Sequence, residues 1–177
     1  MEDLLAMGGE NFAHAERFKR GLGVLSEQVE RGMQLSEQLN YCAHSPEPSP
    51  TGCEVNDALR ALVGLFRRTA ARFRVSLSLA PGRTGLRTSL RAVEVMDLAG
   101  LAVDCALPLL PRDATLMLAV EEQGGLAVAR VGSPAFEALR LQPEYADLAA
   151  CAKTLGVGLC PGPNGEGIVL SLPKAQA

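Results

Sequence analysis

Hydrophobic residues recur at alternating steps of three and four between Glu10 and Ala43. This spacing predicts one long helix with a narrow apolar seam, as in coiled coils. Charged side chains occupy the other faces, so the seam needs a partner helix, most simply a second copy of the chain. The seam positions are Ala15, Phe18, Leu22, Leu25, Val29, Gly32, Ser36, Leu39 and Ala43. We expect a homodimer through residues 10–43, with an interface made by Phe18, Leu22, Leu25, Val29 and Leu39.

A stretch rich in proline and serine, His44–Gly52, ends this helical pattern and indicates a joint between two modules. The chain therefore divides into a helical dimerisation stalk at residues 1–44, a linker at 45–54 and a domain at 55–177. Helices and short strands alternate in the domain, which predicts an α+β fold: a two-layer sandwich with a mixed sheet packed on helices.

The local patterns predict the elements of this domain. Helices are expected at 56–73, with Asn56 or Asp57 as N-cap, and at 87–107, 133–139 and 143–155. Strands are expected at 75–79, 114–121, 126–131, 157–160 and 167–172, the second and third joined by a tight turn at Glu122–Gly125.

Composition narrows the classes of function. The chain has 177 residues, of which 47% are hydrophobic, and a net charge of -3. This balance does not favour a nucleic-acid or membrane partner. An apolar run of about 20 residues, needed to span a bilayer, is absent from the sequence. The short acidic N-terminus does not resemble a signal peptide, and the five cysteines are read as reduced thiols, so we expect a cytoplasmic protein.

Catalytic chemistry has few candidates. The two histidines, His14 and His44, both precede the domain, so a Ser/His/Asp or Cys/His site is not expected. Cys42, His44 and Cys53 do not have the spacing of a common zinc site. These residues therefore predict neither such a catalytic site nor a metal site.

Positive charge gathers at the end of the helix predicted at residues 56–73. Cations at a helix C-terminus complement its dipole, and this is the commoner role. Docking of an acidic partner is the alternative. The residues are Arg67, Arg68, Arg72 and Arg74, beside Phe66 and Phe73.

Five phrases of the chain lie at 54–62, 76–82, 102–106, 124–128 and 165–173. Taken in order, they resemble parts of sensor histidine kinases. The first is similar to the passage from the second dimerisation helix into the catalytic domain, and the last to the terminal strand of that domain. The resemblance implies a dimerisation helix followed by a catalytic domain of the Bergerat fold.

The residues that bind nucleotide in that family do not recur here. By register with Asp104, the asparagine that ligates magnesium falls at Leu101, which has no oxygen to offer. Asp97, one turn earlier, is a candidate remnant. The aspartate that hydrogen-bonds adenine falls near Val131. We therefore expect a vestigial pocket at Asp97, Leu101, Asp104 and Val131, without ATP binding.

The glycine-rich loop of the family cradles phosphate at a helix N-terminus. In this chain Leu141–Ala146 takes its place, without a glycine and with Glu144, whose charge would repel phosphate. There is also no room for the mobile lid that closes over the nucleotide.

The resemblance, with these residues missing, implies a pseudokinase-like signalling or scaffold protein that is not an enzyme and has no cofactor of its own. It would bind a receiver domain, a histidine kinase or a scaffold complex through its dimeric stalk. The arginine cluster of the helix at 56–73 could also receive a phosphorylated receiver domain. An alternative is an ATP-independent histidine phosphotransferase that relays phosphoryl groups through His14. A third alternative is an unrelated α+β domain that binds a small ligand.

Overall fold

The computed structural model describes residues 15–47, 52–82, 84–124 and 126–175. The chain forms two compact units, Met1–Glu37 and Gln38–Ala177. The boundary falls inside the first helix, α2 (Ala15–His44), so its last seven residues belong to the second unit. The start of the helix expected from Glu10 lies outside the described residues.

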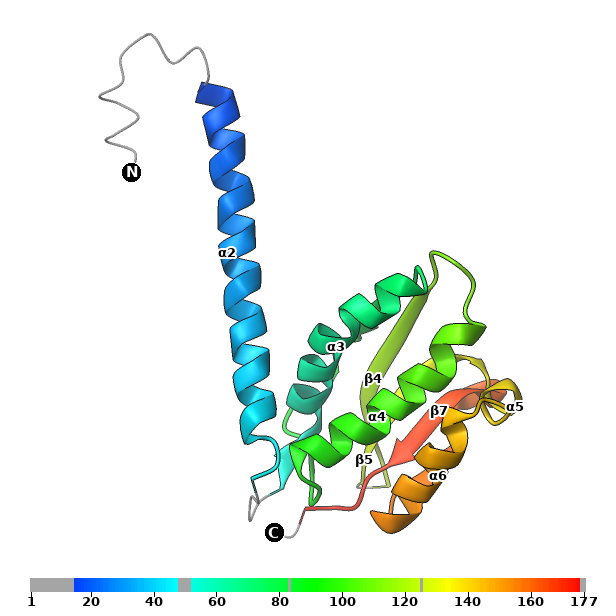
Figure 1. Ribbon diagram of the computed structural model, residues 1–177. Coiled ribbons are helices and arrows are strands. Elements are labelled where there is room, and N and C mark those ends of the chain that lie inside the picture. Colours follow the sequence, from blue (N-terminus) through cyan, green and yellow to red (C-terminus); the bar gives the residue numbers. More distant parts are fainter. Residues whose placement is uncertain (1–14, 48–51, 83, 125, 176–177) are drawn as a thin grey trace. The chain divides into compact units, whose positions relative to one another are not determined.

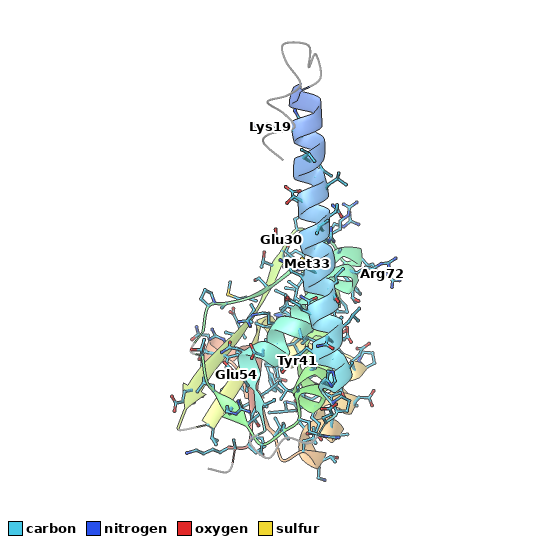
Figure 2. The ribbon with its side chains drawn as sticks, turned by 90° about the vertical axis from the view of Figure 1, so that its left-hand side faces the viewer. Lys19, Glu30, Met33, Tyr41, Glu54 and Arg72 are labelled. Carbon is cyan, nitrogen blue, oxygen red and sulfur yellow. The ribbon has the colours of Figure 1, made fainter. Side chains whose placement is uncertain are left out.

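The stalk helix α2 carries large apolar side chains that are exposed along its length. Leu25, Val29 and Met33 are each 62% exposed, and charged side chains such as Lys19 and Glu30 project from other positions (Figure 2). Leu22 is half-buried. Val24 and Leu35, outside the expected seam, are exposed as well. The apolar surface of the helix is therefore wider than the seam read from the spacing.

The second unit contains a five-stranded mixed sheet in the order β2-β4-β5-β7-β6. Strand β2 pairs with β4 in parallel, and the other neighbours are antiparallel. The strands are β2 (Ser76–Leu79), β4 (Thr115–Gln123), β5 (Leu126–Ala135), β6 (Gly158–Pro161) and β7 (Glu166–Ser171). A separate antiparallel pair joins β1 (Cys53–Glu54) to β3 (Arg87–Thr88).

Helices cover one face of the large sheet (Figure 1). These are α3 (Val55–Arg72), α4 (Ala92–Ala106) and α6 (Glu144–Thr154), with the short α5 (Phe136–Leu139) and the 3-10 turns η1 (Leu107–Leu109) and η2 (Pro163–Gly165) at the connections. Side chains alternate along β4, where Leu116 and Leu118 are buried while Thr115 and Met117 are exposed. The expected α+β architecture, a mixed sheet packed on helices, is confirmed.

The helix expected from Arg87 to Leu107 begins only at Ala92. The residues before it are held to the end of the chain, because the Thr88 hydroxyl donates to the Pro173 carbonyl at 2.7 Å. The helix then begins where the Glu94 carboxylate accepts the backbone N–H of Arg91 at 2.8 Å. This is the reach-back contact of a capping box, and it satisfies a free donor at the helix start.

Two other boundaries differ for a similar reason. Strand pairing holds Glu54 extended, and α3 begins directly at Val55, so neither Asn56 nor Asp57 is the N-cap; Glu54 is. The helix expected over 133–139 is confined to Phe136–Leu139, because β5 continues to Ala135 and pairs with β7 beyond a register shift. Tertiary hydrogen bonds override the local pattern in both places.

None of the helices in the described part of the chain is both long and apolar enough to cross a membrane.

Candidate functional site

Helix α4 is the central element of the helical layer. On one side Gly100 approaches α3 so closely that a Cβ there would lie 3.2 Å from Phe66 Cζ. Towards the core, Leu98, Ala102 and Cys105 have no exposed surface. On the other side α4 packs against α6. The helix is therefore fixed from three directions.

Three of the expected pocket positions share one face of α4. Asp97, Leu101 and Asp104 are four and three residues apart, which places them one above another on the helix. Asp97 is exposed, whereas Leu101 and Asp104 are half-buried. Leu101 packs against the hydrophobic core. The structure thus brings these three positions together, with an apolar side chain at the middle one.

Carboxylates from α4 and α6 meet beside this face. Burial raises the pKa of Asp104, and the negative charge of Glu144 raises it further. The Oε2 atom of Glu144 is buried without a hydrogen-bond partner in the described structure. Burial, with Glu144 and Asp104 nearby, also raises the pKa of the Cys105 thiol to about 11. This interface concentrates negative charge, and we call Asp104 and Glu144 the acidic pair.

The fourth expected position, Val131, lies in the core. Its side chain is 2% exposed, and β5 places it between Leu118 of β4 and Ile168 of β7. It joins the hydrophobic cluster under the helices. A side chain of this kind cannot hydrogen-bond a nucleotide base.

The start of α6 is also unfavourable for an anion. The N-cap residue is Pro143, which makes no side-chain capping hydrogen bond, and Glu144 and Asp147 lie in the first turn. Carboxylates here complement the helix dipole themselves. A phosphate group approaching the same N–H groups would be repelled by them.

The described part of the chain contains no cluster of side chains that could bind a metal ion. Among these residues, no group of three or more His, Cys, Asp or Glu side chains could hold a metal ion. Magnesium prefers oxygen ligands in octahedral geometry, and Leu101 provides none. The residues at this face do not fit a magnesium ion with a triphosphate.

The other sequence-derived positions are distributed differently. The proposed phosphoacceptor His14 lies outside the described residues. Phe18 falls on α2, where its side chain is not described. Leu25, Val29 and Leu39 are exposed on α2, with Leu39 61% exposed.

The joint between stalk and domain contains residues that the pattern of the sequence did not single out. Ser45 is buried, and its carbonyl accepts the Val93 N–H at the start of α4 at 3.4 Å. Gln38 lies against α3 at Gly64, where a Cβ would come within 2.0 Å of its side-chain oxygen. Tyr41 packs against the core, and burial raises its pKa. Gly64, a glycine inside a predicted helix, is the sequence feature that could have indicated the contact with Gln38.

A shallow hollow on the outer face of the sheet bears on the small-ligand alternative. Its volume is about 260 Å³, below the usual range of roughly 300–1,000 Å³ for small-molecule sites. Arg130 at its edge is already paired with Glu121 at 3.0 Å. The hollow does not support that alternative. It is lined by Met117, Ala119, Arg130, Gly132, Pro163, Asn164 and Glu166.

Comparison with known proteins gives the fold. Neither the family models nor the curated proteins match this sequence. Among solved structures, the catalytic domain of histidine kinase ThkA matches 71% of this chain and 97% of its own length, at 15% identity and a TM-score of 0.56. The chain has a histidine-kinase-like fold. This confirms the fold read from the five sequence phrases.

Longer structures match more of the chain. The cytoplasmic segment of histidine kinase QseC covers 84% of it and 95% of its own length, at 15% identity and a TM-score of 0.53. Histidine kinase ThkA in complex with the response regulator protein TrrA covers 98% of it, at 12% identity and a TM-score of 0.54. The chain spans 56% of that ThkA chain.

The acidic pair generates a prediction about stability and pH. Because the folded-state pKa of Asp104 is raised above the ordinary 3.8, its ionised form destabilises the fold at neutral pH. Asp104→Asn should therefore increase the free energy of unfolding at pH 7, raising Tm by up to about 4 °C. The gain in Tm should shrink as pH falls through the folded-state pKa of Asp104, and it should vanish below the pKa of Asp104 in the unfolded chain. Thermal melts across pH measure this.

Asp97→Asn is the matched control, because Asp97 is on the same helix face but exposed. It should leave Tm nearly unchanged. A lower Tm for Asp104→Asn at pH 7 would mean that the carboxylate has a stabilising partner and would contradict the prediction.

Proposed function

We propose that this protein is a non-catalytic signalling or scaffold protein that works without ATP. It binds a receiver domain or a histidine kinase through a dimeric helical stalk. The observation that supports this proposal is a histidine-kinase-like fold in which register with Asp104 predicts Leu101 at the magnesium-ligand position. A side chain without oxygen at that point removes the ligand on which the family's chemistry depends.

The rest of the pocket supports the same conclusion. Val131 is buried in the core where a base-binding aspartate would be needed. Glu144 places a carboxylate at the N-terminus of α6 and raises the pKa of Asp104. Nucleotide binding would have to overcome negative charge at its phosphate end and lack a polar contact at its base end. Leu101, Val131 and Glu144 lie on α4, β5 and α6, so the three obstacles to nucleotide binding come from different elements.

The proposed partners follow from the fold and the stalk. The ThkA structure that shares this fold is in complex with a response regulator. In the present chain, exposed Leu25, Val29 and Leu39 give α2 an apolar surface that is unfavourable in water. Burying it against a second copy explains the exposure, and the dimer then presents its charged faces to a partner.

The proposal predicts that the purified chain does not bind nucleotide. Calorimetric titration with magnesium–ATP should show no saturable heat up to about 1 mM nucleotide. A Kd of that size corresponds to a binding free energy of about -4 kcal/mol. Leu101→Asn, which restores one oxygen ligand, should behave in the same way because Val131 and Glu144 remain. A micromolar Kd for the unaltered chain would overturn the proposal.

The stalk generates a prediction about mass. Light scattering at micromolar concentration should give twice the 18.7 kDa of one chain. The double substitution Leu25→Asp with Val29→Asp places charges in the apolar surface and should produce a monomer of unchanged helix content. Gln34→Asp, on an exposed polar position of the same helix, should leave the dimer intact. A monomeric unaltered chain would contradict the dimeric stalk.

The phosphotransferase alternative has its own test. In that reaction the ring nitrogen of His14 would attack the phosphorus of an aspartyl phosphate, and the receiver aspartate would leave. We expect no acid-labile label on the chain after incubation with a phosphorylated receiver. Label that His14→Gln abolishes and His44→Gln preserves would establish the alternative. His44 is the suitable control because it is the other histidine and is exposed.

A further inference from the structure

Exposed arginines gather at one end of the folded domain. Three lie in the last turns of α3, one in the turn that follows, and one in the loop before β4. Figure 2 shows the Arg72 side chain pointing out into solvent. We call this surface the arginine end; its charged residues are Arg67, Arg68, Arg72, Arg74 and Arg112, all exposed.

Backbone hydrogen bonds bring the two segments together. The Asp113 N–H donates to the Arg74 carbonyl at 2.7 Å, and the Ser76 N–H donates to the Ala114 carbonyl at 2.9 Å. The end of α3 and the loop leading into β4 consequently lie side by side (Figure 1). Arg112, which is remote from α3 in sequence, therefore joins the arginines of that helix.

These arginines have no ion-pair partner within the described part of the chain. The ion pairs found there use other residues, such as Arg60 with Asp57 and Arg91 with Glu94. Arg68 and Arg72 are also four residues apart on one helix face, where like charges are destabilising. The arrangement does not stabilise the domain through charge pairing.

The helix dipole accounts for only part of the cluster. Its effect is confined to the last turn of a helix, which here includes Arg72. Arg74 and Arg112 lie outside any helix. Arg74 adopts a left-handed φ of 56° at a position where glycine is usual. The backbone conformation therefore does not account for an arginine at this position.

An exposed aromatic ring lies within the cluster. Phe73, the C-cap of α3, is 42% exposed between Arg72 and Arg74. Arginine and aromatic residues are enriched at the centres of protein–protein interfaces. Arginine forms bidentate hydrogen bonds with carboxylates, whereas lysine acts as a point charge. All five cations at this surface are arginine.

We propose that the arginine end is a docking surface for an acidic protein, with its carboxylates on the arginines and an apolar side chain on Phe73. Charge complementarity selects this partner, because five of the 17 basic residues lie here in a chain of net charge -3. That net charge disfavours long polyanions such as nucleic acid or an anionic membrane, which would extend beyond the cluster. The surface lies on the folded domain and includes none of the stalk residues.

The test uses the full chain and a fluorescein-labelled peptide that alternates glutamate with leucine. Anisotropy should show saturable binding that weakens as salt is added. Arg72→Glu with Arg112→Glu should weaken it at least about tenfold. Lys153→Glu with Lys174→Glu, the same total charge change at two exposed positions outside the arginine end, should alter the affinity by less than about twofold. Phe73→Ala should weaken binding of this peptide but not of polyglutamate.

Two further measurements keep the test decisive. The melting temperature of the charge-reversed variant should match that of the unaltered chain. Arg72→Lys with Arg112→Lys, which keeps the charge but loses the bidentate geometry, should weaken binding less than charge reversal does. The proposal is overturned if the peptide does not bind saturably below about 1 mM. It is equally overturned if a single-stranded oligonucleotide or phosphatidylserine vesicles bind more tightly than the peptide, or if charge reversal leaves the peptide affinity unchanged.

Discussion

Helix α4 packs on three neighbours at once, and the rest of the domain depends on this contact. Gly100 admits the Phe66 ring of α3, the fully buried Leu98 faces the sheet, and α6 covers the remaining side. Because the helix has almost no freedom to rotate, the positions on its fourth face are set by its register. Leu101 is therefore held at the middle of that face, between Asp97 and Asp104.

The same packing explains why negative charge is tolerated beside α6. Asp104 and Glu144 are brought together by helices that are held mainly by apolar contacts, so the repulsion between them reduces stability without separating the helices. In a kinase the corresponding region would need cations and N–H donors for a triphosphate. A fold stabilised by its core does not depend on those groups, so the fold alone does not determine activity.

Much of the domain could be predicted because its helices and strands have different spacings of hydrophobic residues. Strand β4 and helix α3 bury the residues that the pattern selects, such as Leu118 and Leu59. The predicted boundaries are wrong where hydrogen bonds between distant segments decide the structure. The Thr88 hydroxyl donates to the Pro173 carbonyl, and Glu54 lies opposite Arg87 in the antiparallel pair of β1 and β3. The acidic pair and the joint at Ser45 could not be predicted for the same reason, since each needs two segments to be placed in space first.

The segment that directly follows α2 is held to the start of α4. The Val93 N–H donates to the Ser45 carbonyl at 3.4 Å, and the Arg91 guanidinium donates to the Pro46 carbonyl at 3.4 Å. Residues 45–46 are thus anchored to the helix that organises the domain, whereas the arginine end is held by α3 and the loop before β4. Since α3 and α4 meet at Gly100, a partner that displaces either helix has to disturb this contact. A partner at the arginine end is therefore expected to bind without displacing α3 or α4, with specificity set by the exposed side chains.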